Sequence, residues 1–334
     1  MVDPKSPHDA FVKHTFSNLE NAAVALRSVL PQGLSGRIDW PSLRLEPGSH
    51  VDHRLSDTHT DLLFSTSIAG QKALLYILFE HQSTPDALMP FRLWKYILRV
   101  LDAHVENATT RGLPKLPLPL VVPVVLHHSQ DGWSSPTELA ALFDPVLAND
   151  PELSSVVPRL DFVIDDISHL TDDELTERAL GAAVTLALWA LRDSRRPERL
   201  LASLPRFAGL IADLLRAPNG RDAVLALFRY LYVVAELPPS TLFAQVQTYA
   251  PEAKDTLMTI AEQLEAKGRA EGRAEGRAEA KASAVLAVLE ARQKAITAEQ
   301  RTAIETCTDL GLLDRWLRKA VTLNDTVELF ERRE

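Results

Sequence analysis

The sequence predicts an α/β domain, built on a mixed sheet flanked by helices, that is followed by a mainly α-helical C-terminal region. Short apolar runs in the first half are typical of strands, because turn residues or polar residues bound each of them. Apolar positions at helical spacing lie between these runs and predict the flanking helices. From residue 171 onward almost every segment has helical spacing. The chain therefore divides into a sheet-forming part and a helical part.

The predicted elements of the first part alternate between helix and strand. A helix over residues 8–30 is expected to end at Pro31, because proline cannot continue a helix. Residues 31–50, with several Pro, Gly and Ser residues, are expected to be mostly loop. The later elements are strands over 59–68, 72–80, 118–128 and 160–165, and a helix from Thr84-Pro85 to residue 108.

The helix over 84–108 is expected to bury an apolar face against the sheet. Its predicted inward positions are Leu88, Phe91, Trp94 (or the stem of Lys95), Leu98 and Leu101. The strand over 72–80 is apolar on both faces, which predicts a central place in the sheet.

The C-terminal part contains one low-complexity segment. Gly-Arg-Ala-Glu occurs three times from Gly268 to Glu279, and each glycine costs a helix about 1 kcal/mol relative to alanine. We expect either a soft helix or hinge that packs on a partner, or a solvated tail, with equal support for both. The predicted helices of this part are 172–192, 197–216, 219–235, 238–246, 252–292, 297–305, 309–319 and 324–332.

We expect three segments: 1–168 for the sheet domain, 169–250 for a helical domain, and 251–334 for a long charged helix with short terminal helices. The net charge of −9 argues against simple electrostatic capture of nucleic acid. However, the first 130 residues hold 12 basic and 12 acidic residues, whereas the rest hold 24 and 33. The net charge is therefore only weak evidence against binding of nucleic acid by the first part of the chain.

The sequence shows no export or membrane segment. The N-terminus is polar, and the longest apolar stretch is too short to cross a bilayer. Cys307 is the single cysteine, which excludes an internal disulfide and a cysteine-based zinc cluster. We expect a cytoplasmic protein with no membrane partner.

Two carboxylates are expected to meet at one edge of the sheet. In an antiparallel hairpin that turns near residue 70, Asp61 lies opposite Glu80, and Gln82 lies on the same side of the strand as Glu80. Like charges this close are unfavourable unless a cation neutralises them. Mg²⁺ prefers carboxylate oxygens, so the pair predicts a metal site. The alternative is an ordinary pair of acidic residues at strand ends.

The chain resembles the recombination-promoting nuclease / putative transposase (Rpn, YhgA-like) family. The resemblance covers residues 7–145 and is carried by the order and spacing of several segments. These are HDAFVK (8–13), LEPGSHVD (45–52), SDTHTDLLF (56–64), LFEHQS (78–83), MPFRLWKY (89–96) and PLVVPVVLHH (119–128).

The resemblance implies a PD-(D/E)xK nuclease-like fold and a Mg²⁺-dependent DNA endonuclease, with Mn²⁺ as an alternative metal. Asp61 and Glu80 would be the metal ligands and catalytic carboxylates. Gln82 would stand where the superfamily has lysine, and a glutamine cannot supply positive charge.

Several other residues are candidates for supporting roles near these carboxylates. Positive charge would have to come from the metal or from Arg92 or Lys95, although both also fit the solvated face of a helix. Asp9 and Glu46 are candidate further ligands, with a helix cap and a turn residue as the favoured alternatives. Of His127 and His128, which end a strand near this edge, one is expected to be a packing or hydrogen-bonding residue rather than a ligand.

Three functions are in competition. The first is a DNA endonuclease linked to recombination. The second is a catalytically inactive nuclease-fold protein that binds DNA or protein, which the missing lysine favours. The third is a regulator whose residues 171–334 sense or oligomerise, forming a homo-oligomer through the C-terminal helices.

Overall fold

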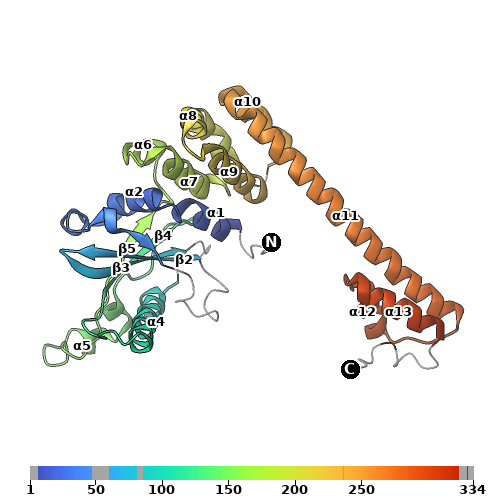
Figure 1. Cartoon of the computed structure of the whole chain (residues 1–334), viewed down its shortest axis with the longest axis horizontal. Helices are drawn as coiled ribbons and strands as arrows, with labels where there is room; N and C mark the ends of the chain where they lie inside the picture. The colour runs from blue at the N-terminus through green and yellow to red at the C-terminus, as the bar shows by residue number, and fades with distance from the viewer. Residues whose placement is uncertain (1–6, 47–59, 81–85, 236, 323–328, 330–334) are drawn as a thin grey trace. The chain divides into compact units, whose positions relative to one another are not determined.

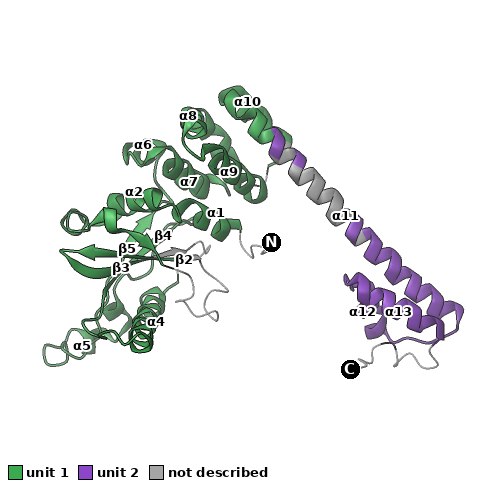
Figure 2. Cartoon of the chain, in the orientation of Figure 1, with its two compact units in different colours: residues 1–257 green, residues 258–334 purple. Residues whose placement is uncertain are grey.

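The computed structural model of the chain describes residues 7–46, 60–80, 86–235, 237–322 and 329 (Figure 1). Its contacts divide the chain into two compact units, Met1–Leu257 and Met258–Glu334 (Figure 2). The predicted boundary after residue 168 lies inside the first unit, and the predicted division into three segments stays a prediction.

A five-stranded mixed sheet forms the centre of the first unit, as the sequence predicts. The strands lie side by side in chain order, β1-β2-β3-β4-β5. The first three strands pair antiparallel, whereas β3, β4 and β5 pair parallel. Their bounds are β1 Arg44–Leu45, β2 Thr60–Ile68, β3 Gln71–Glu80, β4 Leu120–His127 and β5 Val163–Asp166.

The β2–β3 hairpin closes on a two-residue loop. Ile68 pairs with Gln71, and the loop residues Ala69 and Gly70 have φ angles of 50° and 79°. Positive φ at both central residues is the requirement of a type I′ turn, whose twist matches that of the strands. The turn therefore fixes the register of the whole hairpin.

Helix α4 (Met89–Thr110) covers one face of the sheet and connects β3 to β4 (Figure 1). The predicted inward face is wrong at Leu88, Phe91 and Leu98, which are 58%, 43% and 46% exposed, whereas Leu101 packs on the core under α4 as predicted. The predicted start is also wrong, since residues 86–88 are not helical. The buried face is Met89, Leu93, Tyr96, Ile97 and Val100, which pack on strand residues Leu63, Leu74, Tyr76, Val121 and Val125.

The opposite face of the sheet lies under α1 (Pro7–Phe16) and α2 (Leu19–Val29) (Figure 1). The prediction of one helix over 8–30 is wrong. Asn18 interrupts it with extended backbone, and its side chain accepts hydrogen bonds from the amides of Glu20 and Asn21. The interruption is therefore an N-cap that starts a second helix.

A layer of helices packs behind α1 and α2. The predicted helix over 172–192 is two helices, because the chain turns at Ala179 and Gly181, where φ is 49° and 73°. A capping box at Thr171 starts the first of them, as its sequence predicts. The helices of the layer are α6 Asp172–Glu177, α7 Gly181–Asp193, α8 Pro197–Arg216, α9 Gly220–Val234 and α10 Pro239–Tyr249.

The second unit has its own small core. The end of α11 (Lys254–Ala291) packs on α12 (Ala298–Glu305) and α13 (Leu310–Thr322) (Figure 2). The buried residues are Ala278, Ala282, Val285, Leu289, Ile304, Leu313, Trp316, Ala320 and Leu329. The backbone of the Gly-Arg-Ala-Glu segment is helical and belongs to α11. Most of the helix predicted over 324–332 lies outside the described residues.

Short elements complete the fold: α3 Gln32–Ser35, the 3₁₀ turns Trp40–Ser42, Leu139–Leu142 and Pro251–Ala253, and α5 Pro145–Ala148. Among the helices that the structure describes, none combines the length and the apolar character needed to span a bilayer.

Candidate functional site

The backbone register places the candidate carboxylates at one edge of the sheet. Asp61 pairs with Leu78, two residues before Glu80. The prediction that Asp61 lies directly opposite Glu80 is therefore wrong by two residues, because the turn is centred between residues 69 and 70. A register shift of two residues keeps Asp61 and Glu80 on the same face of the sheet, because side chains alternate between the faces. Diagonal neighbours on adjacent strands lie roughly 7–8 Å apart.

The face that carries these positions is the one under α4. On β2 and β3, Leu63 and Tyr76 belong to the core under α4, and residues two apart share a face. Positions 61 and 80 therefore belong to that face. Gln82 lies outside the described residues, and the side chains of Asp61 and Glu80 are likewise not described.

Two more polar positions continue this edge into the parallel strands. Glu80 pairs with His127, and His127 pairs with Asp166, so the three form one row across β3, β4 and β5. The carboxyl ends of adjacent parallel strands are a common place for a binding site in α/β folds. Asp166 was not singled out in the sequence. It follows Asp165, which comes directly after the short apolar run 162–164, so the available signal was a pair of acidic residues at a strand end.

His127 is fully buried within the protein. Its Nε2 lies 3.0 Å from Ser129 Oγ, and its ring meets the Trp133 ring edge-on at 5.0 Å. The packing and hydrogen-bonding role predicted for one of the two adjacent histidines is therefore observed at this position.

Asp166 holds two loops together at the same edge. Its Oδ1 accepts hydrogen bonds from the amide and the hydroxyl of Ser168 at 3.0 and 2.5 Å, and its Oδ2 accepts one from the Trp133 amide at 2.7 Å. Burial would raise the pKa of Asp166, but these hydrogen bonds and the charge of His127 lower it overall. Gly132 fits beside it because a Cβ there would lie 2.9 Å from His169.

Replacing Asp166 with asparagine is expected to destabilise the protein at neutral pH. Its folded pKa is lowered, so the ionised form contributes stability above the unfolded pKa of about 3.9 and loses it as pH falls. At pH 7 we expect Asp166→Asn to melt at a lower temperature than wild type, by about 2–4 °C for each kcal/mol of unfolding free energy that is lost. The difference should shrink near pH 3, whereas exposed Asp131→Asn should melt like wild type at both values. An equal difference at both pH values would contradict this role.

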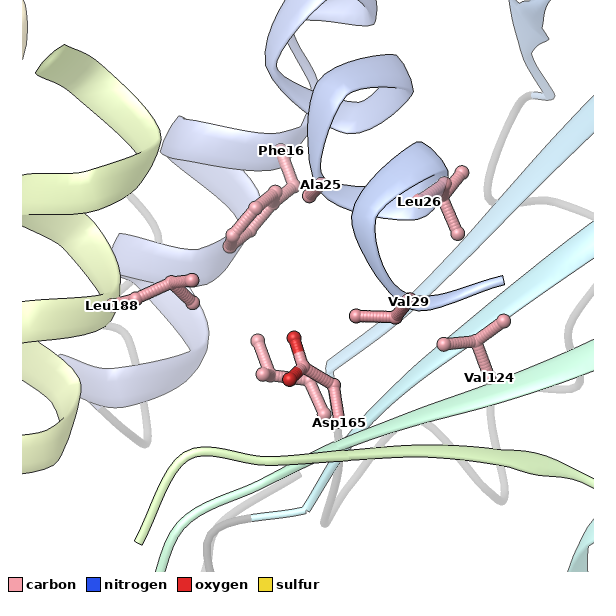
Figure 3. A pocket seen from close by; sticks show the side chains of 8 residues that line it. Phe16, Ala25, Leu26, Val29, Val124, Asp165 and Leu188 are labelled. Atoms are coloured by element: carbon pink, nitrogen blue, oxygen red, sulfur yellow. The ribbon is translucent and has the colours of Figure 1, made fainter. Parts of the chain in front are cut away.

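Asp165 lies on the other face of the sheet. Its two oxygens accept hydrogen bonds from Arg178 at 2.9 Å each, and Arg178 also donates to Ser28 Oγ. The carboxylate borders a small, mostly apolar cavity of about 20 Å³ (Figure 3). The cavity is lined by Phe16, Ala25, Leu26, Val29, Val124, Leu126 and Leu188. Asp165 therefore anchors the helices to the sheet and is separate from the row on the α4 face.

Comparisons with known proteins identify the family of this chain. The model of the family described as "Putative transposase, YhgA-like" matches residues 6–216, which include the whole sheet and the helices through α8.

The chain belongs to the YhgA-like family.

Relatives in this YhgA-like family carry nuclease names. Recombination-promoting nuclease RpnD of Escherichia coli O157:H7 is 28% identical over 260 residues, which cover 78% of this chain and 94% of that protein. RpnC of E. coli K12 is 28% identical over 263 residues, covering 79% of this chain and 82% of that protein. A third relative, from the same strain, is named an inactive recombination-promoting nuclease-like protein, RpnE. It is 29% identical over 264 residues, which cover 79% of this chain and 83% of that protein. Identity alone therefore does not separate active from inactive members. No solved structure matches the chain.

Glu46 extends the acidic edge of this YhgA-like protein by one strand. Its amide donates a 2.8 Å hydrogen bond to the carbonyl of Leu63, so it continues the pairing of β1 with β2. Position 46 is therefore a diagonal neighbour of Asp61 on the α4 face. Asp9 is half-buried in the first turn of α1, where a carboxylate stabilises the helix dipole.

The two basic candidates lie on α4. Arg92 forms an ion pair with Asp86 at 2.8 Å, and Lys95 holds its ammonium 5.1 Å from the centre of the Phe91 ring on the exposed side of the helix. The described side chains form no cluster of three or more residues that could hold a metal ion. The side chains of Asp61 and Glu80 are not among those described.

Loops at the acidic edge are fixed by arginines of the helical layer. Arg196 donates hydrogen bonds to the carbonyls of Ser129, Gln130 and Ser168 at 3.1–3.2 Å. These carbonyls lie in the loops that follow β4 and β5. The layer behind α1 and α2 therefore positions the chain immediately after His127 and Asp166.

Proposed function

We propose that the chain is a metal-dependent DNA endonuclease that acts in recombination. The observation that carries this proposal is the set of acidic positions on neighbouring strands of one face, Glu46, Asp61 and Glu80, in a chain of the YhgA-like family. Several carboxylates at one edge repel one another unless a cation neutralises them. The nuclease names of the relatives support phosphodiester hydrolysis as the reaction.

Asp61 and Glu80 would hold the ion in this proposal, with Glu46 as a further oxygen ligand. Carboxylate oxygens suit Mg²⁺, and Mn²⁺ can replace it. A bound divalent ion would lower the pKa of a water molecule and offset charge on the phosphate. The residues of the chain orient that ion beside the phosphodiester. Gln82 would position water or phosphate through its amide, because it cannot supply positive charge.

The second candidate is a nuclease-fold protein that binds DNA or protein without cutting it. The glutamine in the lysine position favours it, as does the relative named inactive at 29% identity. Titration calorimetry with Mn²⁺ separates the two candidates. Binding that depends on Asp61 and Glu80 supports the endonuclease, and absence of binding supports the second candidate.

Removal of divalent metal tests the proposed activity. The full chain is expected to nick or linearise supercoiled plasmid in Mg²⁺ or Mn²⁺ and to stop when EDTA is added, since the carboxylates alone cannot stabilise the extra negative charge of the reaction. Restoring Mg²⁺ in excess should restore cutting. Cutting that persists unchanged in EDTA, or no cutting with either metal, would overturn the proposal.

A further inference from the structure

The outward face of α4 is apolar and aromatic where a solvated face would be polar. We use the name outer stripe for Leu88, Phe91, Lys95 and Leu98, which recur at helical spacing on the side away from the sheet. The three apolar members are between 43% and 58% exposed. The Trp94 ring lies edge-on to Phe91 at 6.5 Å, so two aromatic rings stand next to each other.

Basic residues outnumber acidic ones along the outer stripe. Residues 86–102 contain three basic residues, Arg92, Lys95 and Arg99, and two acidic ones, Asp86 and the exposed Asp102, in a chain whose net charge is −9. Asp86 neutralises Arg92 at one end. The Nη1 atom of Arg99 is buried and has no hydrogen-bond partner among the residues that the structure describes, whereas the side chain of Lys95 is exposed. The surface therefore favours a partner that is both anionic and able to pack on aromatic rings.

The outer stripe begins beside the acidic edge. Only residues 81–88 connect Glu80, the last residue of β3, to the first turn of α4. From there α4 runs back along the face of the sheet that carries positions 61 and 80. Helix α4 therefore lies over the same face of the sheet that carries the acidic edge.

We infer that the outer stripe of α4 binds an unpaired nucleic-acid strand next to the acidic edge. Phe91 stacks on a base, and Lys95, now held over the Phe91 ring, moves to a phosphate. Stacking plus cations is the usual chemistry of single-strand binding, because every base has a π face and every nucleotide a phosphate. This inference rests on the proposed function, and it names the substrate class as DNA with unpaired bases.

Anisotropy of a fluorescein-labelled single strand, measured with the full chain in EDTA, tests this inference. Phe91→Ala should weaken binding about fivefold or more, the effect of losing one stacked base. Lys95→Ala should reduce the slope of log affinity against log salt by about 0.7, the value for one phosphate contact on a single strand. Phe91→Trp should bind as wild type does. A blunt duplex of the same sequence should bind less tightly than the single strand.

Lys115→Ala is the matched control, because Lys115 is an exposed lysine outside the outer stripe. The Lys115→Ala variant should bind the single strand as tightly as wild type does, with the same slope of log affinity against log salt. Circular dichroism should show that all variants are folded. Wild-type affinity in both Phe91→Ala and Lys95→Ala would overturn the inference. So would sedimentation in which these variants lose self-association but keep DNA affinity, since the stripe would then be an interface between copies. Because EDTA removes metal chemistry, failure here leaves metal-dependent cleavage separately testable.

Discussion

Replacing Arg192 with alanine is expected to lower the free energy of unfolding by about 3–5 kcal/mol. The Arg192 and Asp193 side chains are both fully buried, and two nitrogens of the guanidinium donate to the carboxylate at 2.8 and 2.6 Å. Arg192 also pairs with Asp172 and donates to the carbonyl of Leu170. Burial would lower the pKa of Arg192, but the hydrogen bonds and charges of the two aspartates raise it overall. In the variant, the buried carboxylate of Asp193 would lose the guanidinium of Arg192 as its partner.

Two other groups limit the loss. Arg199 Nε lies 3.1 Å from Asp193, and Ser203 Oγ lies 3.2 Å from it. We therefore expect a value near the lower end of the range. Urea denaturation of the full chain measures it, with Arg216→Ala as the control. Arg216 pairs with Asp213 on the surface, and its loss should change stability by no more than about 0.5 kcal/mol.

The same comparison can contradict the assigned role of the buried pair. If Arg192→Ala and Arg216→Ala have equal stabilities, the pair does not hold the helical layer together. The double variant Arg192→Ala with Asp193→Ala should lose less than the sum of the two single variants, because removing both charges leaves none unpaired.

Strand positions and most helix positions follow from local patterns in the sequence. The apolar runs predicted β2, β3 and β4, and α8 begins and ends where its spacing predicts, at residues 197 and 216. The break at Asn18 was missed because the apolar period continues across it, although Asn followed by Glu two residues later is compatible with a cap. Periodicity locates helices better than it locates their ends.

The phase of α4 shows a limit that periodicity cannot overcome. Its sequence offers two apolar faces, one containing Leu93 and Val100 and the other containing Phe91 and Leu98. Both satisfy helical spacing, and only packing on the sheet selects the first. The second face is consequently exposed and forms the outer stripe.

At the candidate site, the sequence predicted the strands and the edge but not the register. Placing the turn about one residue late displaced the partner of Asp61 from Leu78 to Glu80. Because the register error is two residues and side chains alternate between the faces with a period of two, Asp61 and Glu80 still lie on the predicted common face. The row from Glu80 through His127 to Asp166 could not be predicted, since it depends on parallel pairing between segments far apart in the sequence.

Plasmid cleavage by the Asp61→Ala variant is the most direct test of the acidic edge as the nuclease site. With saturating Mg²⁺, we expect its cleavage rate to be at least about 100-fold below that of wild type, since losing a metal ligand removes several kcal/mol of charge stabilisation. Asp213→Ala, which removes an exposed carboxylate from α8, should cut like wild type. Metal-dependent cutting that survives unchanged in Asp61→Ala would contradict the assignment of the site.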